Sequence, residues 1–416
     1  MNPPPDAQQG PAPAAVRERS PWTMLIALVS AFAMSQAYRT TAAIMAPPLQ
    51  QEFALTEQAL GLFAGTFHFA FGTLQLAMGI GIDLRGLRRT VLTAFPLTMV
   101  GAVLAAAAPD FRLLLLGQAL IGIGCSPAFV ACTVFISRRF PAHRFAAVSG
   151  TAMALGTIGM LLTGTPLAWL IEASSWRTAF FVLGGMSVLS WLAIFALVRE
   201  PPRGAGGSET LGSALRGVVS LLKLPHTWGI VALGSVCYAS FVTLRGLWLG
   251  PMLIELHGFT LVQAGNVAVA ATLAGLFGAP TFGRLDPGAR ARRPVVIAFS
   301  IGAVAFFAVL AANPGTLFTV IGVPVFALLS GYSILLYTYV KSAYPATMTG
   351  RALSVYTMAM FLGVAVMQWS TGAVASASAA WGVPTFAAVF GTVALMLAAG
   401  TAAFAWLPRA GDADSA

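Results

Sequence analysis

Residues 155–170 read LGTIGMLLTGTPLAWL, and a helix with this sequence would be apolar on every face. Apolar runs of about eighteen residues or more recur along the chain between short polar breaks, and a helix needs about this length to cross a bilayer. A transmembrane barrel would instead show segments of about ten residues in which polar and apolar side chains alternate. The sequence therefore predicts an all-α membrane protein.

The composition excludes a water-soluble fold. Of the 416 residues, 58% are hydrophobic and only 9% are charged, and the mean hydropathy is +0.83. A soluble protein of this size carries far more charge on its surface.

Twelve transmembrane helices are predicted. Their expected spans are residues 22–46, 59–79, 90–108, 112–136, 146–171, 179–198, 226–254, 264–284, 294–312, 315–340, 351–375 and 380–407. An even number of spans places both termini on one side of the membrane. The proline-rich residues 1–21 and the charged residues 408–416 are predicted to be disordered tails. The first apolar segment is too long for a signal peptide, so we expect it to be retained as a span.

The net charge of +10 indicates membrane topology more than nucleic-acid binding. Basic residues gather in the tails and in the loops on one side, whereas the loops on the other side contain only Arg112 and Arg177. The positive-inside rule then makes both termini cytoplasmic, in the inner membrane of a bacterium. The basic loops lack the interleaved aromatic residues of a nucleic-acid site, so no nucleic-acid partner is expected. Cys125, Cys132 and Cys237 fall inside predicted helices and are interpreted as packing residues.

The chain repeats itself at an offset of about 204 residues. The run FPA at 140–142 matches YPA at 344–346, and Gly159 matches Gly363. A parallel repeat of six spans is typical of two-bundle transporters. The predicted organisation is a six-helix bundle at 22–198, a cytoplasmic linker at 199–225 and a pseudo-symmetric second bundle at 226–407.

The loop after the second predicted span reads GIGIDLRGLRR at 79–89. It resembles the signature of the major facilitator superfamily, and the resemblance covers nearly the whole chain after the first tail. The resemblance implies the fold of that family, in which two six-helix bundles rock around a site at the midplane. In the family this loop helps to hold the outward-facing state.

The resemblance implies a gating role for Asp83, Arg85 and Arg88. Gly79 and Gly86 would allow a tight turn and a close approach of helices. Asp83 could cap a helix and pair with arginines across the interface between the two bundles. The alternative interpretation of the loop is a topology signal alone.

Two other segments differ in how well they fit the family. The run WRTAF at 176–180 resembles the entry to the sixth span, where we expect an interfacial anchor. Gln118 stands where the family usually has an arginine tied to proton transfer, and the glycine-proline pattern of drug antiporters is only partly present in the fifth span. Both departures count against a proton-driven multidrug exporter.

Two arginines lie deep in predicted helices, whereas every acidic residue lies in a tail, a loop or a span end. Arg39 in the first span and Arg245 in the seventh occupy near-equivalent positions in the two bundles. Two cations without a buried carboxylate need a counter-ion, and guanidinium groups bind carboxylate and phosphate through paired donors. We therefore expect both arginines to bind an anionic substrate. The placement is also similar to that in the organophosphate/phosphate antiporter and organic-anion branches of the family.

Each arginine has a structural alternative. Arg39 could extend toward the membrane surface near Pro47. Arg245 could satisfy carbonyl groups where Gly250 and Pro251 break the helix.

Other polar residues in the spans are weaker candidates. His68 is the candidate for proton coupling, because imidazole takes up a proton near neutral pH, although a packing histidine fits equally well. Additional substrate contacts are expected from residues that could instead be packing residues: Tyr38, Gln36, Tyr238, Tyr337 and Tyr356.

The predicted function is secondary active transport of a small organic anion, a carboxylate or a phosphate ester, by alternating access with anion exchange or proton coupling. The rival is a proton-coupled exporter of amphipathic drugs or metabolites. An enzyme or receptor is not expected, since the sequence has no nucleophile elbow, HExxH run, P-loop or soluble signalling domain. No cofactor and no metal site are expected. The expected partners are a small-molecule substrate and the lipid bilayer, and the protein is expected to be a monomer.

Overall fold

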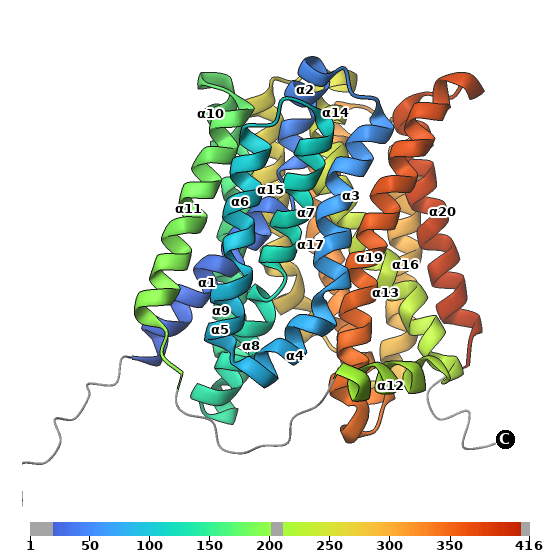
Figure 1. Ribbon diagram of the computed structural model, residues 1–416. Coiled ribbons are helices and arrows are strands. Elements are labelled where there is room, and N and C mark those ends of the chain that lie inside the picture. The colour runs from blue at the N-terminus through green and yellow to red at the C-terminus, as the bar shows by residue number, and fades with distance from the viewer. Residues whose placement is uncertain (1–19, 201–210, 409–416) are drawn as a thin grey trace, which may run out of the picture.

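The computed structural model describes residues 20–200 and 211–408, so the two predicted tails lie outside the described residues except at their inner edges. Within those ranges the chain forms helices and no strand. The helices run side by side between two faces (Figure 1). Helix α1 begins and helix α20 ends at the same face, which we call the terminal face, and the other is the opposite face. The all-α membrane fold is confirmed.

Each predicted span after the second corresponds either to one helix or to consecutive helices that continue as one span. Ten helices of the described residues are long and apolar enough to cross a membrane, and α3 with α4, bent by 41°, makes an eleventh. The remaining predicted span corresponds to α1 and α2, which follow one interrupted course between the faces. The helices of the first half, residues 20–200, are α1 (Pro21–Tyr38), α2 (Ala42–Phe53), α3 (Glu57–Thr73), α4 (Gln75–Arg85), α5 (Leu87–Ala94), α6 (Pro96–Ala106), α7 (Phe111–Cys125), α8 (Ala128–Arg139), α9 (Phe145–Leu162), α10 (Thr165–Ala173) and α11 (Trp176–Leu197).

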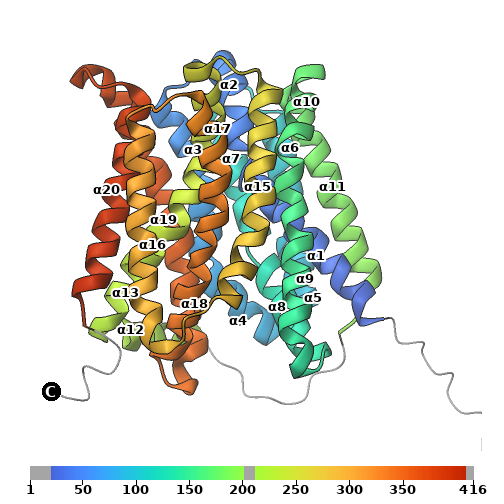
Figure 2. The same ribbon diagram turned by 180° about the vertical axis from the view of Figure 1, so that it is seen from behind.

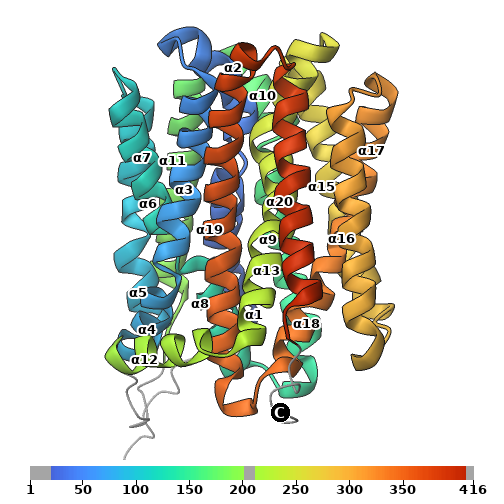
Figure 3. The ribbon, with the colours of Figure 1, turned by 90° about the vertical axis from the view of Figure 1, so that its right-hand side faces the viewer.

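The second half, residues 211–408, begins with a helix that was not predicted. This helix, α12, lies along the terminal face within the predicted linker at 199–225 (Figure 3). Helices α15 to α18 form one flank of the second half (Figure 2). The helices of this half are α12 (Leu211–Leu222), α13 (Pro225–Thr243), α14 (Leu249–Pro251), α15 (Leu261–Arg284), α16 (Ala289–Ala311), α17 (Thr316–Leu329), α18 (Ser333–Ala343), α19 (Ala346–Ser378) and α20 (Thr385–Trp406).

The first predicted span is not one continuous helix. Helix α1 ends at Tyr38 and α2 begins at Ala42. Between them, the hydroxyl groups of Thr40 and Thr41 donate to carbonyl groups of the preceding turn. Such bonds offer the backbone an alternative to helical hydrogen bonding. The interruption places Arg39 at a break in the helix.

The seventh predicted span is also irregular. A π-helical turn at Leu244–Trp248 precedes Pro251, which has no amide hydrogen to continue the helical pattern. Gly250 packs against the carbonyl group of Ala43 in α2, where a Cβ would have no room. That carbonyl is free of its own helical donor because Pro47 stands four residues later. The two halves therefore touch through backbone at this point.

The sequence repeat is also a repeat of backbone contacts. Gly159 of α9 lies against the carbonyl group of Ala33 in α1, and Gly363 of α19 lies against that of Ser235 in α13. In both places a Cβ would overlap the oxygen. Equivalent glycines thus bring equivalent helices together in each half.

The predicted start of the last span at residue 380 is wrong. Helix α19 extends to Ser378, a short 3₁₀ turn follows, and α20 begins only at Thr385. Gly382 has φ of 65°, a left-handed conformation that favours glycine, and it turns the chain between the two helices. Composition alone could not separate this apolar turn from the span that follows it.

We expect Gly159→Ala and Gly363→Ala each to destabilise the protein by about 1–3 kcal/mol, because the added methyl group would overlap a carbonyl oxygen. The measurement is the melting temperature of the purified protein in detergent. Gly185→Ala is the matched control, since a Cβ there meets no atom within 4 Å. Equal melting temperatures for the three variants would contradict the packing argument.

Candidate functional site

Arg39 is buried at the break between α1 and α2. Its Nη1 donates to Tyr238 Oη and its Nη2 to Ser35 Oγ, both at 3.3 Å. The guanidinium carbon lies 4.7 Å from the ring centroid of Phe71 and 4.6 Å from that of Phe361. Tyr238 and Phe361 belong to the second half, so Arg39 reaches across the interface between the halves. Cation–π contacts of this kind contribute about 0.5–2 kcal/mol.

Arg245 lies fully buried in the π-helical turn and reaches in the other direction. Its Nε donates to Ala268 O at 3.1 Å and to Thr272 Oγ1 at 3.3 Å, and its Nη2 donates to Met160 O at 3.0 Å. Met160 belongs to the last turn of α9 in the first half, where the helix dipole places partial negative charge. The carbonyl groups that Arg245 satisfies are therefore those of α9 and α15, and not those beside Pro251.

A cavity of about 170 Å³ lies between the two halves. Its wall contains Tyr238, which contacts Arg39, and Met160 and Thr272, which contact Arg245. The part of α15 in the wall, from Thr272 to Ala279, is the half of that helix nearer the terminal face. The partners of both arginines thus border one shared space.

Four arginines of the described residues are buried, and only two of them lie at the interface between the halves. At the terminal face Arg292 pairs with Asp286, and Arg293 donates to the end of α20, although Arg293 Nε has no acceptor among the described residues. No Asp or Glu is buried among the described residues. Arg39 Nε and Arg245 Nη1 are buried donors without an acceptor among those residues. Each interface arginine therefore keeps a donor for a further acceptor.

The structure brings only some of the predicted polar contacts to this cavity. Tyr238 lines it, and Gln36 Nε2 lies 4.0 Å from the sulfur of Met160 in its wall. The hydroxyl of Tyr38 instead pairs with Ser187 Oγ inside the first half. The remaining two candidates, Tyr337 and Tyr356, pack edge to face within the second half and do not line the cavity.

His68 is buried on α3 and links the two halves. Its Nδ1 lies 3.1 Å from Ala64 O and 3.1 Å from Gln368 Oε1 on α19. Both oxygens are acceptors with the amide oriented in this way, so Nδ1 carries the hydrogen and Nε2 presents a lone pair. No described residue donates to that Nε2.

Hydrogen bonds between the halves also occur at the opposite face. The backbone N–H of Gln58 donates to Ser376 Oγ at 2.8 Å, and Thr165 Oγ1 donates to Asn266 Oδ1 at 2.6 Å. Gly61 lies against the backbone of α19 without room for a Cβ. The halves are thus joined at the opposite face, and the cavity lies on the terminal-face side of these contacts.

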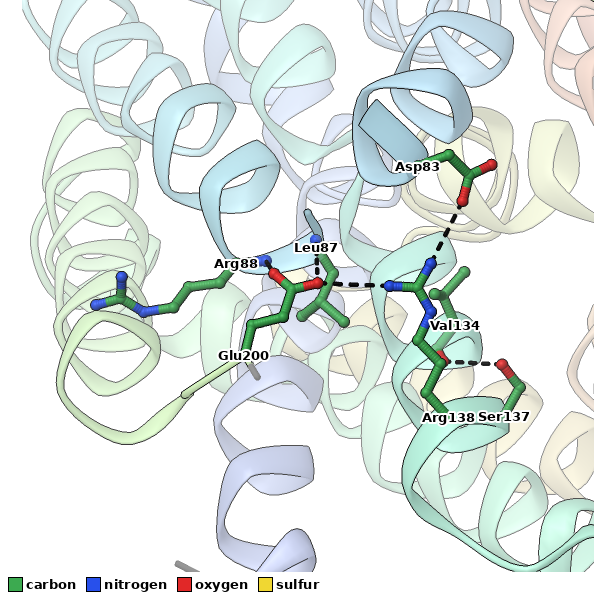
Figure 4. A network of polar contacts seen from close by, with 7 residues as sticks. All are labelled: Asp83, Leu87, Arg88, Val134, Ser137, Arg138 and Glu200. Carbon is green, nitrogen blue, oxygen red and sulfur yellow. Dashed lines mark hydrogen bonds and ion pairs between the residues drawn. The ribbon is translucent and has the colours of Figure 1, made fainter. Parts of the chain in front are cut away.

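The predicted gating loop forms a network within the first half (Figure 4). Arg138 lies 3.4 Å from the carboxylates of both Asp83 and Glu200. The carboxylate of Glu200 also accepts the backbone N–H groups of Leu87 and Arg88, at 3.2 and 3.3 Å. Glu200, and not Asp83, therefore caps α5. In this conformation Asp83 pairs with Arg138 of the same half, so its expected pairing across the bundles in the outward-facing state stays a prediction.

The glycines and arginines of the loop have separate roles. Gly86 has φ of 97° and joins α4 to α5. A Cβ on Gly79 would meet no atom within 4 Å, so the close helix approach expected there is absent in this conformation. Arg88 Nη2 donates to Phe195 O at 2.9 Å, whereas Arg85 is exposed.

The corresponding loop of the second half contains a self-contained ion pair. Arg292 lies 2.6 Å from Asp286 and donates to both of its carboxylate oxygens. These hydrogen bonds hold the pKa of Asp286 below its usual value. Arg293 donates to carbonyl groups at the end of α20, including Phe404 O at 2.7 Å.

Comparison with known proteins agrees with this architecture. The model of the Major Facilitator Superfamily matches residues 27–368. The chain belongs to the Major Facilitator Superfamily. The resemblance read from the loop at 79–89 is confirmed.

Relatives within the superfamily differ in what they carry. A "Probable sulfoacetate transporter" of Cupriavidus necator is 24% identical over 58% of this chain and 59% of its own length. A "Probable sugar efflux transporter" of Helicobacter acinonychis is 29% identical over 47% of this chain and 49% of its own. The chain thus spans about half the length of these relatives. A solved D-xylose-proton symporter shares the fold with a TM-score of 0.74, 15% identity, and coverage of 94% of this chain and 98% of its own.

The expected interfacial anchor before the sixth span differs from the structure. Trp176 is buried, and its Nε1 donates to Glu52 Oε2 at 2.6 Å. Arg177 forms an ion pair with the same carboxylate at 2.6 Å. These contacts hold α11 against α2, so Trp176 is a packing residue of the first half.

The roles of three residues of the site and the loop were not predicted from the sequence. Phe71 and Phe361 contact Arg39, but no sequence pattern distinguishes them from the other phenylalanines of the spans. Glu200 did carry a signal, since it is an acid placed directly after a span on the side that is otherwise basic.

We expect Glu200→Ala to destabilise this superfamily member by about 1–2 kcal/mol, because two backbone N–H groups at the start of α5 lose their acceptor. Asp83→Ala, which removes only an exposed ion pair, should change the melting temperature little. A melting series of both variants measures the difference. A larger loss in Asp83→Ala would show that the capping role is assigned to the wrong acid.

Proposed function

We propose that this transporter carries a small organic anion, a carboxylate or a phosphate ester, across a bacterial inner membrane by alternating access. One observation carries the proposal. Arg39 and Arg245 are buried, each donates to the other half, and their partners border one cavity. No buried carboxylate of the described residues neutralises them.

The physical argument is one of charge compensation. An ion in a low-dielectric interior is costly unless an opposite charge or several hydrogen bonds compensate it. Arg245 receives partial compensation from the end of α9, whereas Arg39 has only hydroxyl groups and aromatic rings. A bound anion would satisfy the remaining donors of both guanidinium groups.

The size of the cavity supports a small substrate. Its volume is about 170 Å³. Drug-sized ligands occupy sites of about 300–1,000 Å³. The relative described as a sulfoacetate transporter also supports an anion, because sulfoacetate is negatively charged at neutral pH.

The orientation follows from the placement of basic residues. The terminal face carries most of them, and the opposite face has Arg112 and Arg177. The positive-inside rule supports the cytoplasm on the side of the terminal face. The cavity would then lie on the cytoplasmic side of the contacts that join the halves. In that setting the loop with Asp83, Arg85 and Arg88 has its proposed gating role at the cytoplasmic surface.

His68 is our candidate for coupling transport to protons, with anion exchange as the alternative. Its Nε2 presents an unpartnered lone pair, and its Nδ1 is fixed by Ala64 and Gln368. The guanidinium of Arg39 contacts the ring of Phe71, which lies one helical turn from His68 on α3. An anion bound to Arg39 would therefore favour protonation of His68, so that proton and anion travel together.

We expect Arg39→Gln and Arg245→Gln each to abolish stabilisation of the purified protein by small carboxylates and phosphate esters. For the wild type, an anion at about 100 times its Kd should stabilise the folded state by about 2.7 kcal/mol. Thermal shifts with a panel of anions measure this effect, and counterflow in proteoliposomes measures transport.

Arg293→Gln is the matched control for these variants. Arg293 is also buried, donates to backbone carbonyl groups and stacks on an aromatic ring, but it lies away from the cavity. Its anion response should remain intact even if its melting temperature falls. Undiminished anion binding by both interface variants would refute the proposal.

We expect His68→Gln to retain counterflow of the anion and to lose uptake driven by a pH gradient, because only the proton acceptor is removed. His257→Gln is the control, since His257 pairs with Thr316 and Thr319 away from the cavity. Retention of gradient-driven uptake in His68→Gln would favour anion exchange.

Export of amphipathic compounds is the second candidate. A mostly apolar cavity of about 430 Å³ lies between α16 and α17, and Ser330 borders both it and the central cavity. The relative described as a "Probable sugar efflux transporter" supports this candidate. Stabilisation by amphipathic drugs that is independent of Arg39 and Arg245 would support this candidate.

A further inference from the structure

The wall of the 170 Å³ cavity contains hydroxyl groups whose hydrogens are already used. Thr157 Oγ1 donates to Met153 O at 3.0 Å, and Ser330 Oγ donates to Ala327 O at 2.8 Å. Each hydrogen is committed to the backbone of the residue's own helix. The hydroxyl oxygens therefore have only lone pairs to offer a ligand.

A third acceptor lies beside the same wall. Gln36 Oε1 is buried and has no donor among the described residues, while the amide nitrogen of Gln36 contacts Met160 in the wall. The hydroxyl hydrogen of Thr272 is also used, because it donates to Ala268 O, and one of the two lone pairs of that hydroxyl accepts from Arg245.

The surroundings of the cavity thus combine two kinds of group. The available donors are the free N–H groups of Arg39 and Arg245, which lie behind the wall, the hydroxyl hydrogen of Tyr238, whose oxygen accepts from Arg39, and the hydroxyl of Ser333 in the wall. The available acceptors are Thr157, Ser330 and Gln36. A ligand with acceptors alone would leave this second set unpaired.

We infer that the substrate is a hydroxylated organic acid, whose anionic group binds the arginines and whose hydroxyl groups donate to Thr157 and Ser330. This inference rests on the proposed function. A second anionic group would meet acceptors at these positions and be repelled. An ammonium group could also donate, but it would add a positive charge beside Arg39 and Arg245, which already lack a carboxylate partner. A neutral hydroxyl donor meets neither obstacle.

Titration calorimetry with four three-carbon acids tests the inference on the full-length protein. Lactate should bind about 3- to 10-fold more tightly than propionate, because a hydrogen bond contributes roughly that factor. Glycerate, with two hydroxyl groups, should bind more tightly than lactate. Alanine, which has an ammonium group in place of the hydroxyl of lactate, should bind more weakly than lactate.

Two variants test which hydroxyl groups of the wall cause the preference for hydroxylated acids. Thr157→Val replaces a hydroxyl by a methyl group of similar size, and Ser330→Ala removes the other hydroxyl. Each should reduce the advantage of glycerate over propionate about 3- to 10-fold while leaving the Kd of propionate unchanged. An unchanged Kd for propionate shows that the variant is folded.

Thr151→Val is the matched control. Thr151 lies on the same helix as Thr157, and its hydroxyl donates to Ala147 O at 3.0 Å in the same manner. It is exposed and does not line the cavity, so its substitution should leave every Kd unchanged.

The outcomes separate this inference from the proposed function. Equal affinities for propionate, lactate and glycerate, abolished by Arg39→Gln, would overturn the hydroxyl inference and leave the anion proposal standing. An advantage of glycerate that survives both Thr157→Val and Ser330→Ala would also overturn the assignment. If none of the acids binds, both proposals fail.

Discussion

The structure depends on how two positive charges are held between its halves without a buried acid. Arg39 and Arg245 cross the interface in opposite directions, the first to side chains and the second to the backbone carbonyl group of Met160. The carbonyl that ends α9 attracts Arg245 through the helix dipole, which no rearrangement of side chains can remove. Arg39 has no such fixed partner, because its contacts in the second half are an aromatic ring and a phenol. The two charges are therefore unequal, and Arg39 has the greater need for a mobile counter-ion.

Both arginines stand at irregular points of their own helices. Their acceptors lie elsewhere, since Arg245 donates to carbonyl groups of α9 and α15, and Arg39 donates to hydroxyl groups. The break at Thr40 and Thr41 and the π-helical turn before Pro251 interrupt the helical pattern next to each arginine. Such interruptions are tolerated inside a membrane protein where neighbouring helices or a cavity take over the hydrogen bonding. At both sites, an arginine inside a span therefore stands at an interruption of the helical backbone.

Much of this architecture follows from sequence, and the reasons are physical. Span positions and the two-bundle repeat are encoded in long apolar runs and in matched segments such as those at 140–142 and 344–346. The burial of Arg39 and Arg245 was foreseeable because their neighbours along the chain are apolar. Contacts between distant helices could not be foreseen from the sequence. Phe71 and Phe361 resemble any other phenylalanine until the fold brings them to Arg39. The pairing of Asp83 with Arg138 in this conformation could not be predicted for the same reason, since it depends on where α8 and Glu200 lie in space.

The closest approaches between helices are made where a side chain is missing. Gly250 meets the carbonyl of Ala43, and Gly159 meets that of Ala33. On the carbonyl side the identity of the residue matters little, because every amino acid offers the same oxygen. Only the glycine side is restricted to one residue type. Divergence can therefore proceed over most of each helix while a few positions preserve the packing, which is how a fold can be shared with a symporter at 15% identity.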